Sequence, residues 1–178
     1  MTQASLPVTL ARIVFMLAAG MLTAGPAAQQ ALAASPPPVV SPGQAPPVAH
    51  PYDIAANAGS AVDKAFAEAK ATNKRVLIDF GANWCPDCRM LAGVMELGPV
   101  QSWIGQNFVP VSVNVDHFNV NMDIAARYGI KVTAIPTVLI VTPDGRLLNA
   151  DGTLVLGNAR TMSSQAVVDQ LAAWNSRS

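Results

Sequence analysis

The chain has 178 residues, of which 51% are hydrophobic and 12% charged, so it can bury a sizeable core and is not disordered as a whole. Its 11 basic and 11 acidic side chains give a formal net charge of +0, so nothing in the composition suggests the basic face that a nucleic-acid-binding protein needs. The length predicts one domain with additional segments.

The first 33 residues have the three-part pattern of a secretory signal peptide. Arg12 precedes an apolar run over residues 13–24, and small residues lead to an A-x-A cleavage site at Ala31-Leu32-Ala33. The alternative, a membrane anchor, is disfavoured because the run is too short to span a bilayer comfortably. No cysteine follows the run, which excludes a lipid anchor on a processed N-terminal cysteine. We therefore expect a periplasmic or secreted protein that loses residues 1–33.

Residues 34–51 contain seven prolines. Proline favours an extended backbone without internal hydrogen bonds, so we expect a semi-rigid, exposed linker with no fold of its own. The alternative is a docking segment for a partner that reads proline-rich chains.

The folded domain is expected to span residues 52–178. A first helix is predicted to begin at Ser60, as a weak N-cap, and to end near Asn73. The elements predicted to follow are a buried strand over 75–80, a helix from Cys85, a short helix over 100–107, a strand over 108–115, a helix over 121–128, strands over 137–142 and 146–148, and a helix over 163–174. This order predicts an α/β sandwich with parallel strands first and an antiparallel hairpin last.

Cys85 and Cys88 are the only cysteines, and they lie three positions apart at the start of a predicted helix. At this spacing both side chains lie on one helical face. The free N–H groups and the dipole of a helix N-terminus stabilise a thiolate at Cys85, and Pro86 fits the first helical turn. Cys85 is therefore the expected attacking thiol, and Cys88 the expected thiol that resolves the mixed disulfide.

Other roles for the two cysteines are less well supported. A structural staple is disfavoured because so small a loop restrains the unfolded chain little. Structural zinc takes four ligands, and beyond the cysteines the chain offers only His50 and His117. Copper bound by the cysteines with His117 or a methionine stays open as an alternative, although we predict no metal site.

The sequence W-C-x-x-C after an apolar strand, with Ile135-Pro136-Thr137 before the hairpin, resembles the thioredoxin family over residues 60–174. The run FGANWCPDC, with NVD and YGI further on, is more narrowly similar to exported thioredoxin-like proteins and to the C-terminal thioredoxin-like domain of bacterial transmembrane disulfide reductases. The resemblance implies a three-layer sandwich with a central mixed sheet of four to five strands.

The resemblance also implies roles for residues around the cysteines. Trp84 would lie at the rim of the site, and Pro136 would be cis and face the cysteines. The backbone edge at Ile135 and Pro136 would pair with the substrate chain. Asp79 would be a buried acid that moves a proton to or from Cys88, with a raised pKa. The alternative for Asp79 is a polar residue at the edge of a strand.

Three departures separate the chain from the usual family pattern. Ser112 stands where a lysine is common near the buried acid, and Gly93 stands where the active-site helix often has proline. Residues 149–162 form a longer segment than the compact family core has. These departures argue against cytosolic-type thioredoxin recycling but not against the fold.

Asp87, between the cysteines, bears on the direction of electron flow. Its charge opposes the Cys85 thiolate, so it should raise the pKa of that thiol and make the pair more reducing. The alternative is an exposed acid at a helix start, neutralised by Arg89.

These observations predict an exported thiol–disulfide oxidoreductase that reduces or exchanges protein disulfides. A copper-binding or partner-binding module and a disulfide-donating oxidase are the alternatives. The chain has no G-x-G-x-x-G after a strand, so no cofactor is expected. Electrons would then come from an upstream protein donor, expected at the membrane. The other partners expected are disulfide-containing proteins, with no nucleic acid, and the protein is expected to be a monomer.

Overall fold

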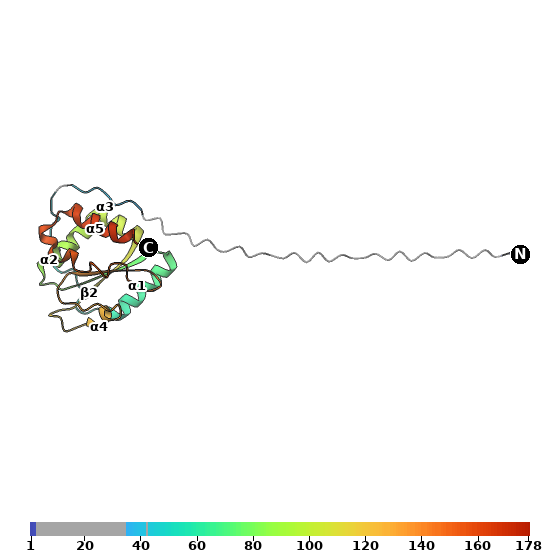
Figure 1. Cartoon of the computed structure of the whole chain (residues 1–178), viewed down its shortest axis with the longest axis horizontal. Helices are drawn as coiled ribbons and strands as arrows, with labels where there is room; N and C mark the ends of the chain where they lie inside the picture. Colours follow the sequence, from blue (N-terminus) through green and yellow to red (C-terminus); the bar gives the residue numbers. More distant parts are fainter. Residues whose placement is uncertain (3–34, 42) are drawn as a thin grey trace. The chain divides into compact units, whose positions relative to one another are not determined.

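The computed structural model describes residues 1–2, 35–41 and 43–178, so nearly all of the predicted signal peptide lies outside the described residues. Figure 1 shows the arrangement of the elements. In chain order these are α1 (Ala58–Thr72), β1 (Arg75–Gly81), α2 (Pro86–Met95), α3 (Gly98–Asn107), β2 (Phe108–Asn114), α4 (Met122–Ala126), β3 (Thr137–Val141), the 3₁₀ helix η1 (Val155–Thr161) and α5 (Ser164–Asn175).

The first helix begins earlier than predicted. Asn57 is its N-cap, because the Asn57 side chain accepts a hydrogen bond from the backbone N–H of Ser60 at 2.9 Å. Ser60 therefore lies inside the first turn, and its assignment as N-cap is wrong. At the other end Asn73 takes a left-handed conformation, with φ 53°, and ends the helix as predicted.

The sheet is mixed, with the strand order β2-β1-β3. Strand β1 pairs parallel with β2 and antiparallel with β3. A parallel pair needs a crossover connection, which α2 and α3 supply. Because β1 is the central strand, all seven of its residues are buried. The predicted mixed α/β fold is thus confirmed.

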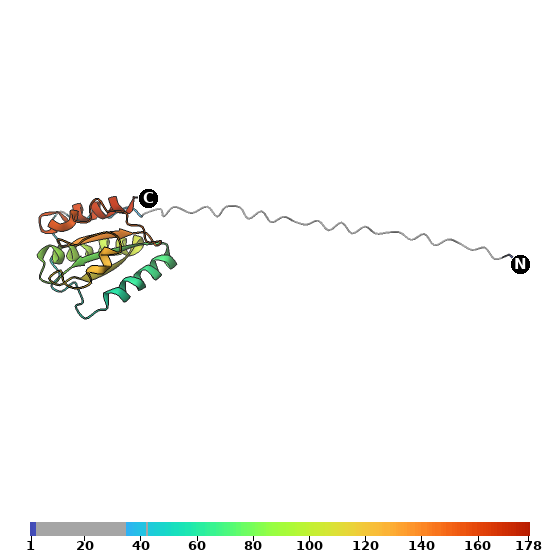
Figure 2. The ribbon, with the colours of Figure 1, turned by 60° about the horizontal axis from the view of Figure 1, so that its bottom comes forward.

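The two faces of β1 bury different helices. Successive side chains of a strand point to opposite faces. Val76, Ile78 and Phe80 share a core with the buried side chains of α1 and α4. Leu77 packs on the opposite face in a second core, with residues of α2, α3 and α5. The sheet therefore lies between two helical layers, with α1 and α5 on opposite sides in Figure 2.

The prediction of four to five strands is wrong for the described residues, which form three. Residues 146–148 make only one bridge, between Val141 and Leu147. The reason is the buried side chain of Asn149, which accepts a hydrogen bond from the Ile140 N–H and donates one to the Val138 carbonyl, both at 2.8 Å. An amide side chain here replaces the backbone of a fourth strand.

The proline-rich segment is not a free linker. It has no regular secondary structure and many exposed residues, as predicted, but it packs along α3, α5 and α2. Prolines offer no N–H, so the segment is fixed through other residues. Its amide groups donate to the domain from Ser35 to Asn107, from Val40 to Gln165, from Ala45 to Ser164 and from Val48 to Arg89.

This packing explains the glycine found where the family often has proline in the active-site helix. A Cβ added at Gly93 would overlap the carbonyl oxygen of Pro46 and come within 3.5 Å of the Pro47 Cα. The segment thus crosses α2 directly over Gly93, and any side chain there would push it away.

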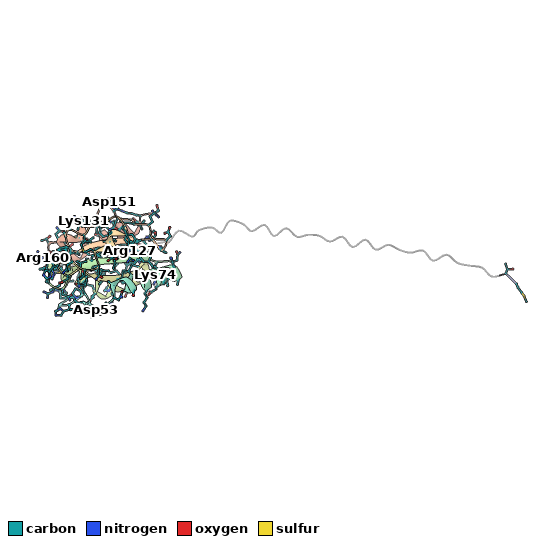
Figure 3. The ribbon with its side chains drawn as sticks, turned by 90° about the horizontal axis from the view of Figure 1, so that it is seen from below. Asp53, Lys74, Arg127, Lys131, Asp151 and Arg160 are labelled. Atoms are coloured by element: carbon teal, nitrogen blue, oxygen red, sulfur yellow. A yellow bond between two sulfur atoms is a disulfide. The ribbon has the colours of Figure 1, made fainter. Side chains whose placement is uncertain are left out.

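The outside of the domain carries charges of both signs. Asp53, Lys131, Asp151 and Arg160 are all exposed, and the stick view of Figure 3 shows them spread around the outside. Across the described ranges, no helix is both long enough and apolar enough to span a membrane.

Candidate active site

The two cysteines are joined in a disulfide at the N-terminus of α2, with their Cα atoms 5.3 Å apart. Cys85 is the N-cap of this helix, and its Sγ accepts a hydrogen bond from the Cys88 N–H at 3.2 Å. Pro86 occupies the first turn, as predicted. Cys85 is 4% exposed and Cys88 is fully buried. This geometry stabilises a thiolate at Cys85 and keeps Cys88 behind it.

A backbone carbonyl faces the disulfide from the other side. The Ile135 carbonyl oxygen lies 3.6 Å from Cys85 Sγ. The peptide bond between Ile135 and Pro136 is cis, as the resemblance implied. The hydroxyl of Thr137 donates to the Ala134 carbonyl at 2.7 Å and so fixes this turn at the start of β3. The structure therefore brings Ile135 and Pro136 beside the cysteines.

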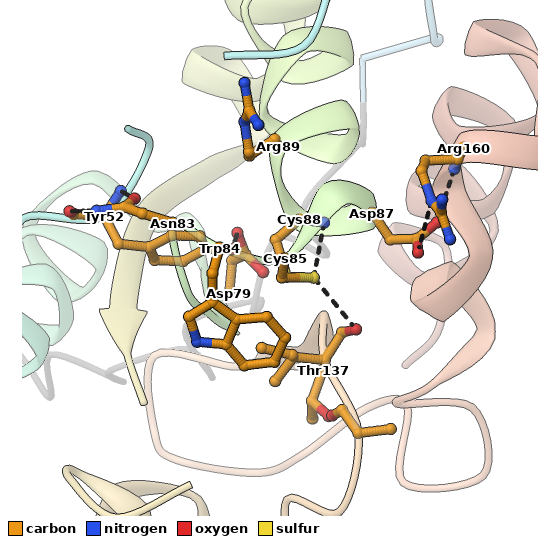
Figure 4. The surroundings of a disulfide bond; sticks show 12 residues. Tyr52, Asp79, Asn83, Trp84, Cys85, Asp87, Cys88, Arg89, Thr137 and Arg160 are labelled. Atoms are coloured by element: carbon orange, nitrogen blue, oxygen red, sulfur yellow. Dashed lines mark hydrogen bonds and ion pairs between the residues drawn. A yellow bond between two sulfur atoms is a disulfide. The ribbon is translucent and has the colours of Figure 1, made fainter. Parts of the chain in front are cut away.

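Trp84 forms an exposed aromatic rim beside the disulfide (Figure 4). It is 48% exposed, and its indole N–H donates to the Asp116 carbonyl at 3.0 Å. His117 stacks on the indole with ring centroids 5.4 Å apart, and Phe118 meets it edge-on at 6.4 Å. The loop after β2 thus extends the rim with apolar surface that the sequence did not predict.

Asp87 is neutralised by Arg160 and not by Arg89. The Asp87 carboxylate accepts hydrogen bonds from the backbone N–H and the Nε of Arg160, at 2.9 and 3.0 Å. Arg160 belongs to η1, so the longer segment over 149–162 reaches the active-site helix. Arg89 instead donates to the Val48 carbonyl at 3.0 Å. The alternative in which Arg89 neutralises Asp87 is therefore wrong.

Asp79 is a buried acid on the central strand β1. It is 1% exposed and lies on the central strand, which excludes the strand-edge alternative. Burial raises the pKa of Asp79 from 3.8 to about 7, and a hydrogen bond from Tyr52 partly opposes this rise. The Tyr52 hydroxyl donates to Asp79 Oδ2 at 2.7 Å. The other oxygen, Oδ1, is buried and has no hydrogen-bond partner among the described residues.

Tyr52 is brought to this place from the chain before α1. Its backbone N–H and carbonyl are both hydrogen-bonded to the Asn83 side chain, at 3.0 and 2.9 Å. The Tyr52 ring is 2% exposed. A Cβ added at Gly81 would overlap the Tyr52 hydroxyl and lie 2.9 Å from Cys88 Sγ. Gly81 thus opens the space in which this hydroxyl approaches Cys88.

The histidines considered as metal ligands do not gather at the cysteines with other ligands. In the part of the chain that the structure describes, no group of three or more His, Cys, Asp and Glu side chains could hold a metal ion. His50 is exposed in the proline-rich segment. His117 stacks on Trp84 and lies 2.9 Å from the Asp116 carboxylate.

Four residues of the site escaped the sequence analysis: Tyr52, Asn83, Phe118 and Arg160. Tyr52 and Arg160 lie far from the cysteines in sequence, and only the packing of the N-terminal segment and of η1 brings them in. Asn83 lies in the short loop after β1, a common place for a side chain that binds backbone groups, and this is the one signal that could have indicated it.

The chain is similar to known thioredoxin-like proteins. The sequence matches the family described as thioredoxin-like domain over residues 62–155. A thioredoxin from Chlorobaculum thiosulfatiphilum is 40% identical over 82 residues, which cover 46% of this chain and 69% of that protein. A thioredoxin from Bacillus subtilis strain 168 is 35% identical over 88 residues, which cover 49% of this chain and 76% of that one. A solved structure described as a disulphide isomerase from Xylella fastidiosa Temecula1 is 37% identical with a TM-score of 0.66, and covers 70% of this chain and 95% of that one.

Proposed function

This chain belongs to the thioredoxin family and is a thiol–disulfide oxidoreductase, and we propose that it is exported and reduces or exchanges disulfides in protein substrates. The observation that carries the proposal is the disulfide at the N-terminus of α2, in which Cys85 is 4% exposed and Cys88 is fully buried. This asymmetry gives the two thiols of the reduced protein different tasks.

In the first step the Cys85 thiolate attacks a substrate disulfide. A bond forms between Cys85 Sγ and one substrate sulfur, and the other substrate sulfur leaves as a thiolate. The N-terminus of α2 favours the attacking anion, because the Cys88 N–H points at Cys85 Sγ. The Ile135 backbone and the rim of Trp84 and Phe118 lie where a substrate chain would approach.

In the second step Cys88 resolves the mixed disulfide. Its thiol passes a proton to the Asp79 carboxylate, and the resulting thiolate attacks Cys85 Sγ. The bond to the substrate breaks, the substrate sulfur leaves as a thiolate, and the Cys85–Cys88 disulfide re-forms. A carboxyl with a pKa near 7 is well matched to this transfer at neutral pH.

Reduction is favoured over oxidation by Asp87. A negative charge within the first turn of α2 destabilises the Cys85 thiolate, and this makes the pair more reducing. Arg160 moderates the effect but is itself largely exposed, so it is screened by solvent. Because the chain carries no nucleotide-binding motif, a protein donor at the membrane would supply the electrons.

Export is proposed from the pattern of residues 1–33 and from the structure that follows. Ser35, two residues beyond the predicted cleavage site, already donates its N–H to Asn107 of the domain. A mature chain that begins at Ala34 would therefore keep the proline-rich segment in place. Fractionation of cells that make the full chain, with sequencing of the N-terminus, should find a periplasmic or secreted protein that starts at Ala34.

The reduction potential of the cysteine pair tests the direction of electron flow. Equilibration of the mature protein with graded thiol–disulfide buffers should give a value near about −270 mV, the thioredoxin end of the range. A value near about −120 mV would make the protein a disulfide donor instead. Cys85→Ser should abolish insulin reduction, whereas Cys88→Ser should trap mixed disulfides with substrates. Activity that survives Cys85→Ser would contradict the proposal.

Disulfide isomerisation is a second candidate, favoured by the similarity to the protein from Xylella fastidiosa that is described as an isomerase. Refolding of scrambled ribonuclease in a glutathione buffer separates the two functions. An isomerase would restore ribonuclease activity in this buffer faster than glutathione alone, whereas a reductase without isomerase activity would not speed the recovery.

A further inference from the structure

We infer that Tyr52 is a positioning residue for the resolving step, because its hydroxyl holds the buried Asp79 carboxylate beside Cys88. The inference rests on the proposed disulfide exchange but concerns a residue outside the range, 62–155, that matches the family. Tyr52 comes from the segment before α1, so the family resemblance assigns it no role.

The position of Tyr52 is fixed at both ends of the residue. Asn83, two residues before Cys85, binds its backbone through two hydrogen bonds, and the hydroxyl binds Asp79 Oδ2 at 2.7 Å. Figure 4 shows Asp79 in the view between Tyr52 and the cysteines. The same loop therefore sets both the attacking cysteine and the tyrosine.

The Tyr52 hydroxyl makes the two carboxylate oxygens of Asp79 different, because it binds only one of them. Oδ2 accepts from Tyr52, while Oδ1 is buried and unpartnered among the described residues. A buried carboxylate oxygen without a donor is costly, and a proton from the neighbouring Cys88 thiol relieves that cost. The overlap of a Gly81 Cβ with both the hydroxyl and the Cys88 sulfur places these groups on the same side of β1.

Few other ionisable groups face Asp79. Strands β2 and β3 place Ser112 and Val138 opposite it, and the buried polar residues of α5 are the uncharged Ser164 and Asn175. Arg75, on β1 itself, binds Asn175 and the Arg177 carbonyl instead. On α2, Asp87 and Arg89 bind Arg160 and Val48 instead. Cys88 and Tyr52 are thus the groups that decide when Asp79 binds a proton.

The direction of the effect follows from the donor role of the hydroxyl. Burial and the neighbouring Asp79 raise the pKa of Tyr52 far above its usual range, so the phenol stays protonated and donates. A donated hydrogen bond favours the charged carboxylate and lowers the pKa of Asp79. Loss of the hydroxyl in Tyr52→Phe should therefore raise the Asp79 midpoint by about one pH unit.

Two measurements test the inference. In the oxidised protein, the carboxyl carbon of Asp79 is titrated by NMR, and Tyr52→Phe should move its midpoint from about 7 to about 8. In the reduced protein, stopped-flow reaction with 5,5′-dithiobis(2-nitrobenzoate) releases one thiolate as Cys85 attacks and a second as Cys88 resolves. The second phase should become about threefold to fivefold slower at neutral pH in Tyr52→Phe and recover at higher pH.

The controls separate positioning from a structural effect. Tyr128, the other tyrosine of the chain, stacks on Phe66, and Tyr128→Phe should leave both measurements unchanged. In an Asp79→Asn background, Tyr52→Phe should cause no further shift of the second phase. Should Tyr52→Phe fail to fold, 3-fluorotyrosine in the Tyr128→Phe protein labels Tyr52 alone. This stronger donor should lower the Asp79 midpoint.

The outcomes are distinct. If the wild-type protein releases no second thiolate, the proposed function is wrong and the inference falls with it. If the wild-type protein resolves normally but Tyr52→Phe leaves the Asp79 midpoint and the second phase unchanged, the inference alone is overturned.

Discussion

The buried carboxyl of Asp79 should make the stability of the oxidised protein depend on pH. Its pKa is about 7 in the folded state, against 3.8 for the ordinary group, because burial disfavours the carboxylate. The folded state therefore binds this proton more tightly than the unfolded state. The stability contributed by the protonated carboxyl is fully present below about pH 4 and is lost as the pH rises through about 7.

The size of the effect follows from the two pKa values. Their difference of about 3 units corresponds to about 4 kcal/mol, of which about 3 kcal/mol falls between about pH 4.5 and about pH 8.5. Asp79→Asn carries no titratable group there. Its free energy of unfolding, relative to the wild-type protein, should thus rise by about 3 kcal/mol over this interval. The pH dependence is the predicted quantity, since the buried amide adds a constant cost of its own.

Guanidinium unfolding of the oxidised proteins, followed by the fluorescence of the buried Trp103 and Trp174, measures this difference. Asp63→Asn, at an exposed position on α1, is the matched control and should show no such trend. A difference between Asp79→Asn and the wild-type protein that stays constant within about 0.5 kcal/mol across the interval would refute the burial argument.

Five further substitutions test the packing of the domain. Arg160→Gln should remove the partner of the Asp87 carboxylate and make the reduction potential more negative by about 10 to 20 mV. Asp87→Asn should shift the potential in the positive direction. Titration with thiol–disulfide buffers measures both shifts. Gly93→Ala should lower the free energy of unfolding by about 1 to 3 kcal/mol, because its Cβ overlaps the Pro46 carbonyl. The control, Gly105→Ala in α3, places its Cβ in open space and should be neutral or stabilising. Equal effects of the two substitutions in urea unfolding would contradict this. Asn149→Ala should cost about 2 to 4 kcal/mol in thermal unfolding, because two buried backbone groups of β3 lose their partner.

The sequence predicts the elements that have regular hydrophobic patterns. It does not predict where a side chain takes the place of a backbone hydrogen-bond partner. Strand β1 and the start of helix α2 lie within one residue of their predicted positions, because an apolar run and a cysteine at a helix start have clear local signals. The strand predicted over 146–148 is absent, and no hydrophobic periodicity could have indicated this. One buried amide, that of Asn149, binds the edge of β3 in its place.

The site divides in the same way. The disulfide and the buried position of Asp79 are seen in the structure, since both follow from a motif and its spacing along β1 and α2. The partners of the two acids could not be predicted. Asp79 is bound by Tyr52 and Asp87 by Arg160, which lie 27 and 73 positions away in the chain. Contacts at such separations depend on tertiary packing rather than on local pattern.

The N-terminal segment connects these observations. A proline-rich composition indicates a chain that forms no secondary structure, but it does not decide whether that chain is free. Here four amide groups and a glycine on α2 hold the segment against the domain, and the chain then continues to Tyr52 under the cysteines. The backbone of Val48 pairs with Arg89, the residue after Cys88, in both directions. Residues outside the family core therefore contact both the active-site helix and the buried acid Asp79, through Val48 and Tyr52.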